Sequence, residues 1–397
     1  MSIGSGPVLS RMLALWVLVS GCVETSPTSP PDAGTAADAG TVADARAGAP
    51  DAADAGTQAG ADATAASDSG SPAADSGNLS ADAGGPANSD ASTPPDSGAP
   101  PDSGAPPGAL PSGDNGIAAR YPRDNGIGAD PAVIFADDFE SYADASELGT
   151  NWDAIYHNAR IATEAANVYA GTKSLEFRSP QQSAELSNGV ARTLREEKDV
   201  LFLRFYSKFD GSFDVVGSSH NGGGISAHYF VNGNATPGVP ANGTNKFLVE
   251  YESWRGEAAE PNPGNLNVYI YHPEQRSMWG DHFFPDGTVL PNTSIPGDFG
   301  SEFVARPNIV PELGRWYAYE LMLRANTPGQ RDGRIACWLD GALIADFPNL
   351  RLRDVDTLTI DRFGLSLHIG SNTVRETWKW YDNVVAATAY IGPVFDP

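Results

Sequence analysis

Apolar and polar residues alternate along much of the second half of the chain with a period of two, which is the period of a β-strand. The longest such stretch runs from residue 314 to residue 341. Apolar side chains recur on one side of each of its halves, at Tyr317, Tyr319, Leu321 and Leu323 and then at Ile335, Cys337 and Leu339. Turn-forming residues at 326–329 and 332–333 separate the halves, and Asp340 and Gly341 follow. The pattern predicts a long antiparallel hairpin that a tight turn extends into a third strand at 342–347.

The same reading predicts strands in most of the chain from residue 133 onward. They are expected at 133–135, around 139 and 142, and at 174–178, 184–186, 201–209, 247–254, 267–271, 359–368 and 378–386. The only segment with helical periodicity is a possible short helix near 144–148. We therefore predict an all-β fold, a concanavalin-like β-jelly roll in which two sheets form a sandwich.

The chain before this region has a different composition. Residues 23–113 are almost entirely Ala, Asp, Gly, Pro, Ser and Thr, which bury too little apolar surface to offset the entropy of ordering. We expect a signal segment at 1–21, a disordered tether at 22–117 without a specific partner, and the jelly roll at 118–397. The formal net charge of −25 and the lack of Lys/Arg clusters argue against nucleic-acid binding.

A cysteine follows the apolar run near the N-terminus. Val19, Ser20, Gly21 and Cys22 resemble the lipobox of bacterial lipoproteins, which implies an acylated Cys22, export and anchoring to a bacterial outer membrane. The alternative is an ordinary signal peptide with a chance cysteine. The other cysteine, Cys337, lies on the apolar side of its strand, so we expect a small buried residue and no disulfide.

Strand parity separates core positions from a second face. On 247–254, Phe247, Val249 and Tyr251 suit the core, which places Glu250, Glu252 and Trp254 opposite. Other side chains expected on that opposite face are Arg204, Tyr206, Lys208, Tyr269, Tyr271, Arg362 and His368. Aromatic rings mixed with charges are typical of a sugar-binding groove, although a solvated convex surface is the simpler alternative.

The loop at 216–224 is too rich in glycine to be regular structure, and it lacks the lysine and the helix of a phosphate loop. His220 lies in it, and His228 follows. None of the six histidines shows metal-ligand spacing, so a catalytic zinc is not predicted.

The order of the strands and loops along the chain resembles that of jelly-roll polysaccharide lyases of family 14, the alginate lyase type. It resembles the glucuronan lyases of family 20 less closely. The resemblance rests on GRWY…NTPG…WLDG, the 209–224 strand and loop, FLVEYESWRG, NVYIYHP, PNLRLRDVDTLTID and YDNVV, about 260 residues in all. Where the family has a loop lysine, this chain has Ser219 or His220. Where the family has an arginine on the next strand, it has Glu250 or Tyr251.

The resemblance implies β-elimination on a uronate-containing polysaccharide, with Tyr269 or Tyr271 as base or acid. From the residues, His220 or His228 could be the other proton-transfer group, and Arg204, Lys208 or Arg362 could neutralise the uronate. Two other functions remain open: a retaining glycosidase that uses Glu250 and Glu252, and a non-catalytic carbohydrate-binding module.

We expect a monomer whose catalysis needs no cofactor. In related jelly rolls the first and last strands share a structural calcium, which here implies Glu140 and Asp382; solvated turn carboxylates are the alternative. Trp316 and Trp338 are expected to line or support the groove.

Overall fold

The computed structural model describes residues 109–181, 184–217, 219–256, 261–291, 299–370 and 375–396. The expected signal segment, Cys22 and most of the expected tether lie outside these residues. Among the described residues, no helix has the length and apolar character needed to cross a membrane.

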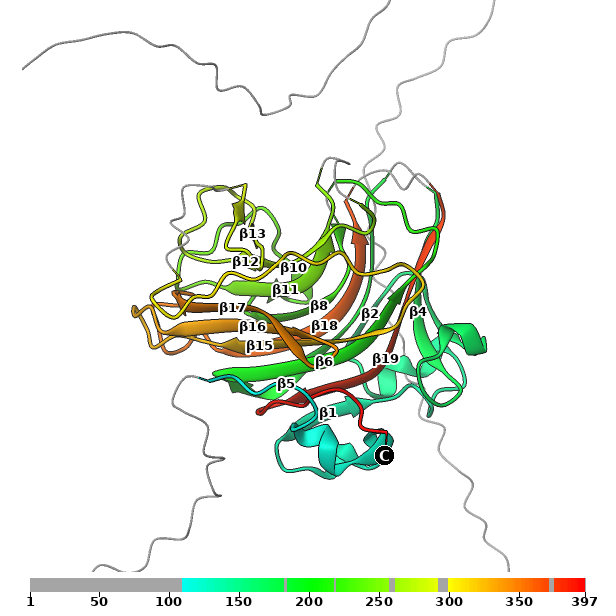
Figure 1. The fold of residues 1–397 in the computed structure, drawn as a ribbon. Coiled ribbons are helices and arrows are strands. Elements are labelled where there is room, and N and C mark those ends of the chain that lie inside the picture. The colour runs from blue at the N-terminus through cyan, green and yellow to red at the C-terminus, as the bar shows by residue number, and fades with distance from the viewer. Residues whose placement is uncertain are drawn as a thin grey trace, which may run out of the picture. The chain divides into compact units, whose positions relative to one another are not determined.

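Two antiparallel sheets contain nearly all the strands (Figure 1). The first sheet has the order β17 (Ala342–Leu350), β16 (Gly333–Leu339), β15 (Tyr317–Arg324), β6 (Val200–Phe209), β19 (Thr377–Ala387), β4 (Ser174–Ser179) and β3 (Ala159–Ala162), and β1 (Val133–Asp137) also pairs with β19.

The second sheet has the order β14 (Val289–Leu290), β13 (Asp281–Phe283), β12 (Asn265–Tyr271), β11 (Phe247–Trp254), β8 (Gly223–Ala227), β18 (Ile360–Ile369), β5 (Leu186–Lys198) and β2 (Ala154–Tyr156). The short strand β7 (Ser219–His220) pairs with β18, and β9 (Phe230–Val231) and β10 (Asn234–Ala235) form a separate ribbon.

The main core lies between the two sheets. It contains the alternating residues of β15 and β16 together with those of β11, β12 and β18, among them Leu321, Cys337, Val249, Ile270 and Leu365. The predicted hairpin is confirmed; Leu321 pairs with Cys337 in it, and Asp340 and Gly341 turn with φ of 49° and 77°. The all-β sandwich and the buried Cys337 are therefore confirmed.

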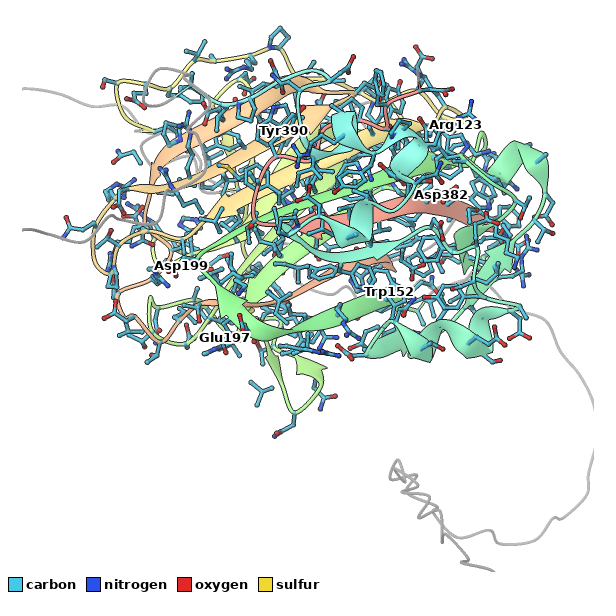
Figure 2. All side chains as sticks on the ribbon, turned by 90° about the horizontal axis from the view of Figure 1, so that it is seen from below. Arg123, Trp152, Glu197, Asp199, Asp382 and Tyr390 are labelled. Carbon is cyan, nitrogen blue, oxygen red and sulfur yellow. The ribbon has the colours of Figure 1, made fainter. Side chains whose placement is uncertain are left out.

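A second apolar cluster covers the outer face of the first sheet. Three short 3-10 helices, η1 (Ile117–Arg120), η2 (Pro122–Asp124) and η3 (Ile127–Ala129), pack there against the C-terminal residues. Ile117 N–H donates to Tyr390 O at 3.0 Å. Figure 2 views this side and labels Arg123, Asp382 and Tyr390 on it. Residues 110–117, expected in the tether, belong to this packing, because Trp338 Nε1 donates to Pro111 O at 2.8 Å.

Two 3-10 helices lie elsewhere, η4 (Ala145–Thr150) and η5 (Ala165–Asn167). The first matches the short helix expected near 144–148 and begins at Asp144, whose carboxylate accepts from Ser146 N–H.

Some strand predictions were wrong. Phe139 and Tyr142 are buried but follow the end of β1, and the strand expected at 184–186 overlaps the 13-residue β5 only at its first residue, Leu186. The charged residues at 195–198 interrupt the alternation of apolar and polar positions, so the pattern does not indicate how far β5 extends.

The glycine-rich loop was also wrongly predicted to be irregular, because β7 and β8 run through it. A Cβ added to Gly222 would lie 1.8 Å from Tyr251 O, and one added to Gly223 would lie 2.2 Å from Phe205 Cε1. These glycines therefore allow a strand to approach β11 and the core closely, rather than making the chain irregular.

Candidate functional site

The face of the second sheet that is turned away from the core carries the candidate site, and we call it the site face. Parity defines it. On β11, Phe247, Val249 and Tyr251 enter the core cluster, so Glu250 and Glu252 lie on the site face. Pairing then places Tyr269 opposite Glu250 on β12. The expected sorting of β11 and β12 is confirmed.

Strands β7 and β18 add two histidines to the same face. His368 is paired with His220, while Leu365, Leu367 and Ile369 enter the core. His220 and Glu250 therefore lie on the site face, whereas Tyr251 points into the core.

His220 is held between two carboxylates. Its Nδ1 lies 3.1 Å from Glu250 Oε2 and 3.0 Å from Glu252 Oε2. Burial alone lowers the pKa of His220, but the charges of Glu252 and Glu250 outweigh it and hold that pKa well above its ordinary value. The two carboxylates therefore favour the protonated form of His220 when no other cation lies there.

The neighbouring histidines are in the opposite charge state. Burial, with the charge of His220 as a second cause, lowers the pKa of His368 to about 4 and that of His282 to about 3. His368 Nδ1 lies 2.5 Å from Ser187 Oγ, which leaves Nε2 as its unengaged ring nitrogen. His282 Nδ1 lies 2.9 Å from Asn267 Oδ1, and its ring stacks on Trp254 with centres 4.2 Å apart.

The two tyrosines named from the sequence differ in position. The Tyr269 ring lies 4.7 Å from the His220 ring, centre to centre, and Gly280 N–H donates to its hydroxyl. Burial raises the pKa of Tyr269, which favours an acid over a base. Tyr271 is 1% exposed and packs with Tyr229. Its ring also lies below the Lys246 ammonium, 4.5 Å from ring centre to Nζ.

Arg362 lies on the site face, but far from His220. It is six residues from His368 along β18, roughly 20 Å at strand spacing. Its guanidinium lies 4.0 Å from the centre of the Phe230 ring and donates to Tyr156 at 3.1 Å. His228 is more distant still from the cluster and faces Glu197 at 3.6 Å.

The expectation that Arg204, Tyr206 and Lys208 share this face is wrong. They belong to β6, in the first sheet, and project from that sheet's outer face. Arg204 is fully buried against Asp124, and Lys208 Nζ lies 2.8 Å from Asn167 Oδ1. Parity identified the correct side of the strand, but only the strand order shows to which sheet it belongs.

The two tryptophans expected at the groove also belong to that other side. Trp338 lies in the outer cluster of the first sheet. Trp316 is placed near Lys208 and Tyr169, with Nζ of the lysine 5.6 Å from its ring centre. Neither lies on the site face.

Glu140 and Asp382, the positions implied for calcium, clamp one loop. Glu140 Oε1 accepts from the N–H groups of Thr172 and Lys173, both at 2.7 Å, and Asp382 Oδ2 accepts from those of Tyr169 and Ala170 at 2.9 and 3.2 Å. Burial raises the pKa of Asp382 to about 8. These N–H donors occupy oxygens that calcium would need, so the residues fit a loop clamp better than a calcium site.

A set of potential metal ligands was missed by the sequence analysis. One His220 nitrogen and one oxygen each from Glu250 and Glu252 lie within 4.8 Å of one another, the one such group of three found among the described residues. Histidine spacing alone could not reveal it. The available signal was Glu250 and Glu252 two residues apart on one side of a strand.

Comparison with known proteins gave no family model that matches the chain and no matching curated protein. Solved structures that are similar include alginate lyase Aly36B, with 17% identity, a TM-score of 0.47, and coverage of 66% of this chain and 99% of that one. The alginate lyase vAL-1 from Chlorella virus has 14% identity, a TM-score of 0.46, and coverage of 64% and 99%. The endo-β-1,4-glucuronan lyase from the fungus Trichoderma reesei has 16% identity, a TM-score of 0.41, and coverage of 64% and 95%. These solved structures are of the types that the sequence motifs resemble.

Proposed function

We propose that this chain binds a uronate-containing polysaccharide on the site face and cleaves it by β-elimination. The observation that carries the proposal is the stacking of two histidines in different surroundings, His220 between two carboxylates and His368 against Ser187. Elimination needs a base for the C5 proton, an acid for the departing O4 and a cationic group beside the carboxylate.

The structure suggests a role for each group. His368 is neutral above about pH 4 and presents Nε2, so we assign it the base. His220 turns Nδ1 to the two glutamates, which leaves Nε2–H to donate to the uronate carboxylate. Tyr269 retains its proton and lies against His220, so we assign it the acid.

The residues around this centre suit a chain-like substrate. Trp254 offers an aromatic ring on the same face, and Arg362 provides a cation several sugar units away along β18. Tyr271 is too buried to touch a sugar, so we assign it to supporting the loop that covers it.

The geometry argues against a retaining glycosidase built on Glu250 and Glu252. Both carboxylates converge on one nitrogen of His220, and the Glu252 side chain has no exposed surface. A sugar ring cannot enter between them, whereas a retaining mechanism places the ring between two carboxyl groups roughly 5–5.5 Å apart.

The test is incubation with a panel of polyuronates while the ultraviolet absorbance of unsaturated uronate ends is followed. We expect an increase with the native chain and none with His368→Ala, while His228→Ala, a histidine outside the site, matches the native chain. New reducing ends without that absorbance would indicate hydrolysis and contradict elimination. Polysaccharide binding without either product would indicate a binding module and would also contradict it.

We also propose, from the lipobox resemblance, that acylated Cys22 anchors the domain to a bacterial outer membrane. Mass analysis of the mature protein tests this, since a diacylglyceryl mass on Cys22 is expected, and an unmodified Cys22 would contradict it.

A further inference from the structure

We propose that His220, Glu250 and Glu252 bind one divalent transition-metal ion, with Zn²⁺ as the best-fitting representative. One nitrogen and two carboxylate oxygens form a donor set of the mixed type that zinc accepts, whereas Ca²⁺ prefers oxygen alone. The proposal does not rest on the proposed function, because it concerns ion binding whether or not the chain cleaves a polysaccharide.

The spacing of the donor atoms fits such an ion. Two of the separations are 3.0 and 3.1 Å, from His220 Nδ1 to Glu252 Oε2 and Glu250 Oε2. Ligand atoms at about 2.1 Å from a zinc ion in tetrahedral geometry lie roughly 3.4 Å apart, so small side-chain movements would suffice. The strands hold the three residues in place, since Glu250 and Glu252 share β11, and β7 contacts β11 beside them.

A second observation points to a missing partner. Glu252 is 1% exposed, and its Oε1 has no hydrogen bond within the described part of the chain. His282 Nδ1 lies 3.8 Å from this oxygen, and that nitrogen already faces Asn267. A buried carboxylate oxygen without a donor costs free energy, and a metal ion would offset this cost.

The site is partly exposed to solvent. The side chains of His220 and Glu250 keep 24% and 17% exposure, while Glu252 has none. Three protein ligands with one exposed edge leave a coordination position for water or for a ligand oxygen, as in open zinc sites.

The test is calorimetric titration of chelator-treated, dialysed protein with Zn²⁺, and with Co²⁺ followed by its visible absorption. We expect one equivalent to bind, and the affinity to fall at least about 100-fold in His220→Ala and in Glu252→Gln. Glu250→Gln, at a partly exposed position, provides a second ligand variant if Glu252→Gln does not fold. His228→Ala removes a histidine that faces a glutamate elsewhere, and it should bind like the native chain.

Thermal unfolding provides an independent readout. Zn²⁺ should raise the Tm of the native chain and leave that of Glu250→Gln unchanged, and Ca²⁺ should raise neither. Absence of binding, or binding that survives His220→Ala and Glu250→Gln, would overturn the proposal. Neither assay uses a polysaccharide, so the result is separate from that of the lyase test.

Discussion

The rings of His220 and His368 stack with their centres 5.4 Å apart and their planes 20° apart, on the paired strands β7 and β18. The two rings share one surface but not one charge. His220 lies against two carboxylates, whereas His368 lies against Ser187 and next to the positive charge of His220. This difference allows the His220 ring to face a carboxylate as a cation while the His368 ring accepts a proton.

Removing the proposed base should abolish elimination. We expect His368→Ala to lower the rate by about 10²- to 10⁴-fold, the usual contribution of a general base, with the fold intact by circular dichroism. His228→Asn is the matched control, since His228 has φ of 49°, which asparagine tolerates. A His368→Ala variant with native activity would remove this residue from the mechanism.

The pH dependence of elimination should have two limbs. The rate should rise through about pH 4, where His368 loses its proton, and fall above the ordinary range of histidine, where His220 loses its own. In His220→Gln, the NMR-measured pKa of His368 should move upward, because one cause of its depression is gone while burial remains. An unchanged pKa of His368 would show that His220 does not act on it.

Acid should destabilise the domain through the same buried histidines. The pKa of His282 is about 3 in the folded chain, whereas an unfolded histidine has a pKa near 6.5, so unfolding takes up a proton between these values. The stability is full above about pH 6.5 and declines as the pH falls toward 3. We expect His282→Asn to flatten this part of the curve in urea unfolding, and His228→Asn to leave it unchanged. A native-like slope in His282→Asn would contradict the assignment.

Arg204 should contribute to the stability of the fold and not to the elimination reaction. It is fully buried on the first sheet and pairs with Asp124 of η2, so Arg204→Met leaves that carboxylate without its cation. We expect a loss of about 3–5 kcal/mol in the free energy of unfolding. Folded Arg204→Met, measured well below its Tm, should keep the native elimination rate. Loss of activity in a folded variant would place Arg204 back in the site.

The close approach at Gly223 should be intolerant of a methyl group. The added Cβ would meet Phe205 in the core at 2.2 Å, so we expect Gly223→Ala to lower stability by about 1–3 kcal/mol. Gly211→Ala is the control, because nothing lies within 4 Å of its added Cβ. Equal stability of the two variants by thermal unfolding would show that β8 can move away from Phe205.

The sequence alone was sufficient for the class of fold and for the sidedness of individual strands. The alternation on 247–254 correctly separated Val249 from Glu250, because parity is a local property that every strand obeys. The hairpin of β15 and β16 was likewise recognisable locally, from the turn residues between its two halves.

What tertiary structure alone decided is which strands share a sheet. Arg204 and Glu250 both alternate with core residues on their strands, yet the two strands belong to different sheets. Conversely, His220 and His368 are far apart along the chain and lie on paired strands. The charge states of the histidines also depend on the tertiary structure, since the pKa of a histidine depends on its burial and on the carboxylates nearby. Local alternation carries neither kind of information, because sheet order and burial arise from contacts between distant segments.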